Sequence, residues 1–105
     1  MAVRAPTSFS SVSPRDAALD ALSHEIAGEQ ATSLGRAGRR VEETLDRLAA
    51  SGGGDAELLR ALIQDAADAV YAYFIQRELM GLRRHQDVIR EYRIPDAVLA
   101  RLGAR

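Results

Sequence analysis

A run of four small residues, Ser51-Gly52-Gly53-Gly54, divides the 105-residue chain near its middle. Three consecutive glycines end a helix, because each costs about 1 kcal/mol of helix stability relative to alanine. The long segments on either side do not show the alternation of apolar and polar residues that marks a β-strand. The run therefore predicts two long helices joined by a short loop, which makes them antiparallel neighbours.

The segment before the glycines predicts one helix from Pro14 to Ala50. Ser13 is a suitable N-cap, proline fits the first helical position, and Asp16 lies in the first turn, where an acid interacts favourably with the helix dipole. An apolar stripe at 100° per residue follows this helix and consists of Leu19, Leu22, Ile26, Leu34, Val41, Leu45 and Leu48.

Glycines inside this helix, at positions 28, 35 and 38, leave two interpretations open. The helix either kinks or breaks near residues 33–35, since glycine weakens a helix interior, or Gly28, Ala31, Thr32 and Gly35 form a second, small face, separate from the leucine stripe, that a neighbour approaches closely. Centring the hairpin on Gly53 places Tyr71 opposite Gly35, so aromatic side chains of the second helix would pack on that small face. A helix with two packing faces usually has two neighbours.

The second helix is predicted from an N-cap at Asp55 to about Gly81. Its apolar stripe consists of Leu59, Leu62, Ile63, Ala66, Val70, Tyr73, Phe74, Arg77 and Gly81. A second patch near the end of the helix points in another direction, and we expect the remaining chain to cover it. This patch consists of Tyr71, Ile75, Leu79 and Leu82.

Two short helices are predicted after Gly81. The first runs from His85 to Tyr92, the dipeptide Ile94-Pro95 interrupts it, and the second continues through Leu102. The predicted fold is therefore all-α, a long antiparallel helical hairpin with two short C-terminal helices. Because two long helices alone cannot bury two faces each, we expect a homodimer in which two hairpins form a four-helix bundle. The leucine stripe and the stripe around Tyr73, Phe74 and Arg77 would form the core of that bundle.

Composition narrows the setting of the protein. The chain has no cysteine, which excludes disulfides, cysteine–zinc sites and a cysteine nucleophile, and which fits a reducing cytoplasm. No apolar run approaches the ~20 residues of a membrane-spanning helix. Residues 1–13 lack the apolar core of a secretory signal and are expected to be a flexible tail before a single helical domain, residues 14–105. We therefore expect a cytoplasmic protein that does not enter a membrane.

Arg77 is the most unusual residue of the second helix, because it lies at the centre of an apolar stripe. A buried arginine needs a partner, since an unpaired buried charge costs several kcal/mol. The hairpin register brings Glu25 and Glu29 within reach, and a structural ion pair with these residues is the favoured interpretation. Binding of a ligand is a second interpretation, and a buried stem with its charged head in water is a third.

No group of residues indicates catalysis, a cofactor or a metal. His24 lies near Glu25 and Glu29, but the Glu-x-x-His pairs of bundle metal sites are absent. His85 with a neighbouring acid and serines is no evidence for a nucleophilic triad, because such proximity is common by chance. We therefore expect a protein that is not an enzyme and that binds no cofactor.

The C-terminal segment is the basic part of the chain. Residues 83–105 carry six arginines against three acids, a net charge of +3, within a chain whose net charge is −1. Arg83, Arg84, Arg90 and Arg93, together with the patch around Leu79, are the interaction candidates. Nucleic acid is the alternative partner, because two short helices around a turn loosely resemble a helix-turn-helix. Interleaved acids and the lack of a glycine turn argue against it.

Three stretches carry a resemblance to a known family: Leu34-Gly35-Arg36-Ala37-Gly38-Arg39-Arg40, then Tyr73-Phe74-Ile75-Gln76-Arg77-Glu78 continuing through Gly81-Leu82-Arg83, then Val88-Ile89-Arg90-Glu91-Tyr92 with Ile94-Pro95. Together they resemble a family of short bacterial proteins of unknown function over about residues 16–103. The resemblance implies a bacterial, intracellular, helical protein and supplies no activity. The function expected from the residues is a non-catalytic homo-oligomeric structural or protein-interaction module. Its expected partner is a second copy of the chain, and an unidentified protein partner is an alternative.

Overall fold

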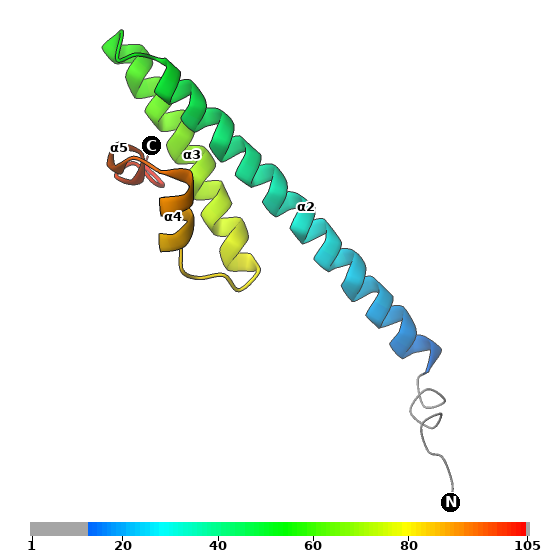
Figure 1. Ribbon diagram of the computed structural model, residues 1–105. Coiled ribbons are helices and arrows are strands. Elements are labelled where there is room, and N and C mark those ends of the chain that lie inside the picture. The colour runs from blue at the N-terminus through cyan, green and yellow to red at the C-terminus, as the bar shows by residue number, and fades with distance from the viewer. Residues whose placement is uncertain (1–12, 105) are drawn as a thin grey trace, which may run out of the picture. The chain divides into compact units, whose positions relative to one another are not determined.

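The computed structural model describes residues 13–104 and contains four helices in that range (Figure 1). They are α2 (Pro14–Ala50), α3 (Ala56–Leu79), α4 (Gln86–Tyr92) and α5 (Asp96–Leu99). The described residues form no strand, so the all-α fold class is confirmed. The predicted flexible tail, residues 1–13, lies outside the described residues except for Ser13.

Local sequence signals account for the ends of the helices. The Ser13 Oγ accepts a hydrogen bond from the Asp16 backbone N–H at 3.0 Å, and the Asp55 side chain accepts one from the Glu57 N–H at 3.3 Å. At the end of α3, Gly81 has a positive φ of 87°, and the Leu82 N–H donates to the Arg77 carbonyl at 2.9 Å. A left-handed glycine is the usual stop for a helix, because glycine lacks the β-carbon that disfavours this conformation.

The long helix α2 is continuous from Pro14 to Ala50, with no break near residues 33–35. The glycines within it are therefore tolerated, and the kink that the sequence left open does not occur. The chain nevertheless divides into two compact units, Met1–Ala31 and Thr32–Arg105. The first unit contributes the beginning of α2, and the second contributes its end together with the other three helices.

The core of Thr32–Arg105 joins all four helices. Val41 and Thr44 of α2 are fully or almost fully buried, as are Val70 of α3 and Val98 of α5. Tyr73, Phe74, Val88 and Ile94 complete the centre, and a shell of half-buried apolar residues surrounds it. Burial of such side chains stabilises a fold by roughly 1.5–3 kcal/mol each. The hydroxyl of Thr44 does not interrupt this core, because it donates to the Arg40 and Val41 carbonyls of its own helix.

Two expectations about packing are wrong. The segment after Gly81 contacts Tyr71 through Gly103 but leaves most of the predicted patch uncovered, since Tyr71, Ile75, Leu79 and Leu82 are 47%, 40%, 69% and 42% exposed. Instead α4 and α5 contribute to the same core as Tyr73 and Phe74, which are only 7% and 8% exposed. These two aromatic side chains are therefore buried within one chain and cannot form the core of a dimeric bundle. The physical reason is that the larger apolar face of α3 attracts the short helices more strongly than its smaller patch.

Gly38, not Gly35, is the glycine where another helix approaches closely. A β-carbon at Gly38 would lie 2.9 Å from the Tyr92 hydroxyl oxygen and 3.5 Å from Cε1 of Tyr73. At Gly35 the nearest atom would be the Arg39 Nη1 of the same helix, at 3.7 Å. Tyr71, predicted to face Gly35, contacts Gly103 instead. Gly38 does not belong to the predicted small face of Gly28, Ala31, Thr32 and Gly35, so this close approach was not predicted from the sequence.

We predict that alanine stabilises the protein at Gly35 but not at Gly38. Gly35→Ala should raise the free energy of unfolding by roughly 0.5–1 kcal/mol, because alanine favours a helix and meets only a flexible side chain. Gly38→Ala should show no such gain or lose stability, because its methyl group would collide with the Tyr92 hydroxyl. Urea unfolding followed by circular dichroism measures both values.

The variant Tyr92→Phe is the control for the second substitution, because it removes the oxygen atom that causes the collision. In this background Gly38→Ala should become more favourable than in the wild type, a coupling that a double-mutant cycle resolves. Equal effects of alanine at positions 35 and 38 would contradict the close approach at Gly38.

Candidate functional site

A polar cluster of three side chains lies where α3 turns into α4. The Arg77 Nε donates a hydrogen bond to the His85 Nδ1 at 3.2 Å, and the Arg77 Nη2 donates to the Arg84 carbonyl at 2.8 Å. The other ring nitrogen of His85, Nε2, lies 2.9 Å from the Glu78 Oε2. Arg77 and Glu78 are at the end of α3, while His85 is the N-cap residue of α4. The cluster therefore joins the two ends of the connecting segment.

The geometry defines the state of the histidine ring. Because Nδ1 accepts a hydrogen bond from Arg77, the proton of a neutral ring must be on Nε2, from which it is donated to Glu78. The ring also stacks on Phe74, with centroids 4.1 Å apart and planes 4° apart. His85 thus has an apolar contact on its face and a polar contact at each nitrogen, an arrangement that holds the segment between α3 and α4 in place.

The environment of Arg77 differs in part from the sequence interpretation. Its guanidinium carbon lies 5.9 Å from the centre of the Tyr73 ring, and its side chain is half-buried. Its hydrogen bonds within Thr32–Arg105 go to His85 and to a carbonyl group. Glu25 and Glu29 belong to the other compact unit, so the predicted ion pair with them stays a prediction. The sequence reasoning missed His85 as a partner, although its separation of eight residues across a glycine turn was a usable signal.

A second polar tie connects α3 to the end of the chain. The Arg101 Nε donates to the Gln64 Oε1 at 2.9 Å, and the Gln64 Nε2 donates to the Ala104 carbonyl at 3.2 Å and to Asp68 at 2.9 Å. Gln64 was not singled out from the sequence, and Arg101 was counted only among the basic residues of the C-terminal segment, because each is an ordinary surface residue type. Their role depends on the fold, which brings residues 37 positions apart into contact.

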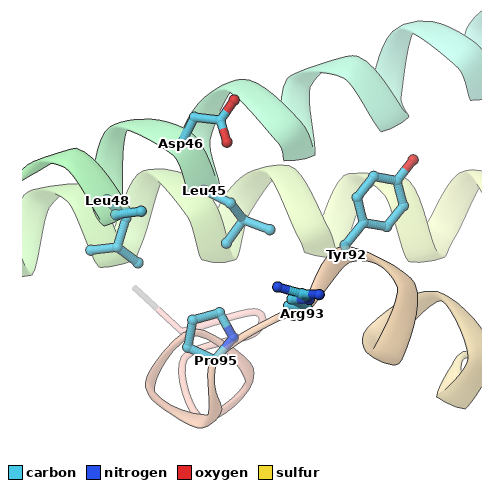
Figure 2. Close-up of a pocket in the computed structure, with 7 residues that line it drawn as sticks. Leu45, Asp46, Leu48, Tyr92, Arg93 and Pro95 are labelled. Atoms are coloured by element: carbon cyan, nitrogen blue, oxygen red, sulfur yellow. The ribbon is translucent and has the colours of Figure 1, made fainter.

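An open groove lies between α2 and the segment that joins α4 to α5 (Figure 2). It has a volume of about 370 Å³ and is lined by Leu45, Asp46, Leu48, Ala49, Tyr92, Arg93 and Pro95. Arg93 has a left-handed backbone, with φ of 54°, as the C-cap residue of α4. This conformation costs a non-glycine residue roughly 1–2 kcal/mol, and it turns the chain so that Ile94 enters the core. The groove is therefore a consequence of how α4 ends.

The arginines predicted as interaction candidates are all exposed, but they differ in whether they form an ion pair within the chain. Arg83, Arg84, Arg90 and Arg93 are all exposed. The Arg90 guanidinium is paired with Asp87 on the same helix. Among residues 13–104, no group of three or more histidine and acidic residues could hold a metal ion, and no buried side-chain nitrogen or oxygen lacks a hydrogen-bond partner. No helix in that range combines the length and apolar character needed to cross a membrane.

Tyr92 has the clearest electrostatic perturbation in the described part of the chain. Burial raises the pKa of Tyr92 to about 12, and a hydrogen bond with the Tyr73 side chain together with the nearby acids Glu42 and Glu91 acts in the same direction. The two tyrosine rings meet edge to face, with centroids 5.6 Å apart. Ionisation of Tyr92 would place a negative charge in this contact, so the folded protein favours the neutral phenol.

We predict that stability falls as the pH rises from about 10 to 12. The pKa of Tyr92 is raised in the folded chain, so its contribution is complete below the unfolded value near 10 and is lost as the pH rises through the folded value. The chain has no lysine and no cysteine, so the three tyrosines are the side chains that ordinarily ionise in this range. Thermal unfolding at intervals of pH measures the fall.

Tyr92→Phe should flatten this dependence, whereas Tyr71→Phe, at an exposed ring, should leave it intact. A curve for Tyr92→Phe that is as steep as the curve of the wild type would contradict the assignment.

Comparison with known proteins places the chain in a family without assigning an activity. No curated protein and no solved structure matches the chain. One family model matches, described as a family of unknown function, DUF6665, and the match extends over residues 1–105. This extent confirms the resemblance noted in the sequence. The chain therefore belongs to the DUF6665 family of proteins of unknown function.

Proposed function

We propose that the protein is a non-catalytic module that associates with a second copy of itself and acts through protein–protein contact. The observation that carries this proposal is the exposure of large apolar side chains in two places. On the first part of α2, Leu19, Leu22 and Ile26 are 53%, 51% and 48% exposed. On α3 and the loop after it, Leu79 and its three neighbours in the patch are exposed as well.

Such groups of apolar side chains favour a partner. Single exposed leucines are common on proteins, but contiguous exposed patches usually mark sites of interaction. By helical periodicity the three residues of α2 share one face, since their spacing of three and four residues returns to the same side. Tyr71, Ile75 and Leu79 follow each other at intervals of four residues and likewise share a face of α3.

The polar side chains that lie together support a structural role rather than chemistry. In the cluster around His85, Arg77 donates hydrogen bonds to the ring and to a carbonyl group, and Glu78 forms a hydrogen bond with the other ring nitrogen. Gln64 and Arg101 are bonded to each other. These groups are used in holding helices and loops together. The proposal also includes a bacterial cytoplasmic setting, which the absence of cysteine supports.

We predict that the purified protein is a dimer at micromolar concentration. Its mass should be about twice the 11.4 kDa of one chain, because association covers the exposed apolar groups. Size-exclusion chromatography with light scattering and native mass spectrometry both measure this mass, and the second also reports any bound molecule. A stable monomer at this concentration would contradict the homo-oligomeric proposal.

Nucleic-acid binding through the C-terminal arginines is the second candidate function. The observation in its favour is the exposure of Arg83, Arg84, Arg90 and Arg93. Against it, Arg90 is paired with Asp87, and Arg101 is bonded to Gln64. The described residues 83–104 carry five arginines against three acids, a net charge of only +2.

We predict little or no binding to DNA or RNA at 50 mM salt. A fluorescence titration with duplex DNA and single-stranded RNA at several salt concentrations measures it, since phosphate contacts produce a steep dependence of affinity on salt. Tight binding that Arg83→Glu/Arg84→Glu abolishes would favour this second function over the first.

A further inference from the structure

We propose that residues 14–31 of one copy dock, through Leu19, Leu22 and Ile26, onto the exposed patch of Tyr71, Ile75, Leu79 and Leu82 of a second copy. This inference rests on the proposed homo-oligomeric function and states which surfaces meet. The two surfaces belong to the same chain, so a dimer can form the contact twice, once in each direction.

The docking surface on residues 14–31 is an apolar stripe with acidic residues along both of its sides. Residues 14–31 carry Arg15 against Asp16, Asp20, Glu25 and Glu29, a net charge of −3 with His24 neutral. At 100° per residue, Glu25 and Glu29 fall on one side of the leucine stripe, and Asp16 and Asp20 fall on the other. All of these acidic residues are exposed. The stripe therefore fits an apolar partner that has basic residues at its edge.

The exposed patch of Tyr71, Ile75, Leu79 and Leu82 has basic residues at its C-terminal end. Leu79 and Leu82 are 69% and 42% exposed, and the next two residues of the chain, Arg83 and Arg84, are exposed as well. The side chain of neither arginine is needed in the cluster around His85, because Arg84 contributes only its carbonyl oxygen there. Both arginines are therefore available to the acids of a second copy.

Two acidic residues close to the patch already form hydrogen bonds within the chain. Asp68 accepts a hydrogen bond from Gln64, and Glu78 is bonded to His85. At the Leu79 end of the patch, residues 77–84 carry Arg77, Arg83 and Arg84 against Glu78, so the excess charge there is positive. Opposite charges at the rim of an apolar contact favour the correct partner and the correct orientation.

The dimensions of the two surfaces match. Leu19 and Ile26 are seven residues apart, which is roughly 10 Å along a helix, and Tyr71 and Leu79 are eight residues apart, roughly 12 Å. Both present their apolar side chains at intervals of three or four residues, the spacing with which helices pack against each other. Each surface can therefore cover the other along its whole length.

Charge argues against the simplest alternative, in which residues 14–31 of two copies pair with each other. Each such segment carries a net charge of −3, with acids on both sides of the apolar stripe. Like charges across an interface are unfavourable, whichever way the helices run. The segment therefore favours the basic end of the patch over its own copy.

Charge reversal in two separate variants tests the contact. Asp20→Arg/Glu29→Arg changes one acid on each border of the stripe, and Arg83→Glu/Arg84→Glu changes the rim of the patch. Each variant alone should dimerise at least tenfold more weakly than the wild type, because like charges then face each other. An equimolar mixture should form a heterodimer with an affinity within about threefold of the wild type, because both contacts are again complementary. Analytical ultracentrifugation measures all three affinities, and circular dichroism confirms that each variant is folded.

A third variant controls for attraction between net charges. Arg36→Glu/Arg60→Glu changes the net charge by the same amount as Arg83→Glu/Arg84→Glu, at exposed positions outside both surfaces. It should dimerise like the wild type, and when mixed with Asp20→Arg/Glu29→Arg it should not restore the wild-type affinity, because only one of the two contacts is then complementary.

The outcomes separate this inference from the proposed function. A wild-type dimer that both reversals leave intact, or that the mixture fails to restore, overturns the docking of these surfaces but leaves self-association standing. Restoration by the third variant also overturns the docking. A monomeric wild type overturns both.

Discussion

The fold of Thr32–Arg105 depends on the burial of one face of α3. Val70, Tyr73 and Phe74 lie on that face, and the remaining three helices supply the side chains that cover them. A hairpin of two helices would leave part of this face in water, because Val88, Ile94 and Val98, which follow α3 in the chain, belong to the same core. The two short helices, α4 and α5, complete the core within a single chain, and that completion decides which apolar residues remain outside. The patch around Leu79 stays exposed because α4 and α5 pack on the other face of α3, while Gly103 contacts the patch at Tyr71.

Polar interactions define how that segment is attached. The Arg77–His85–Glu78 cluster holds the start of α4 close to the end of α3, and the bond between Gln64 and Arg101 holds the end of the chain to the middle of α3. Neither tie is strong by itself, since a hydrogen bond contributes only about 1 kcal/mol net. They act at the two ends of the segment, at His85 before α4 and at Arg101 after α5. The left-handed Arg93 lies between them and directs Ile94 into the core.

The surfaces left exposed are unusual for so small a chain. A protein of this size buries a modest fraction of its surface, so its stability depends strongly on the burial of each large apolar side chain. Here eight of the large apolar residues in the described part are well exposed, and most of them lie in two groups. One group is bordered by acids and the other ends in arginines. The contact with a second copy that we propose would cover both groups.

Periodicity and end signals by themselves determined the helices of this protein. Ser13, Asp55, the glycine run, Gly81 and Pro95 act on neighbouring backbone, so their effect can be recognised without knowing what surrounds them. The apolar stripe of α2 and the larger face of α3 were likewise evident from spacing. Only the tertiary structure decided which face of α3 the short helices cover, that Gly38 is the point of close approach, and that His85 is the partner of Arg77 within this unit. Each of these depends on contacts between residues far apart in the chain. Several alternative packings of the helices fit the same local sequence pattern, so the sequence pattern alone does not select among them.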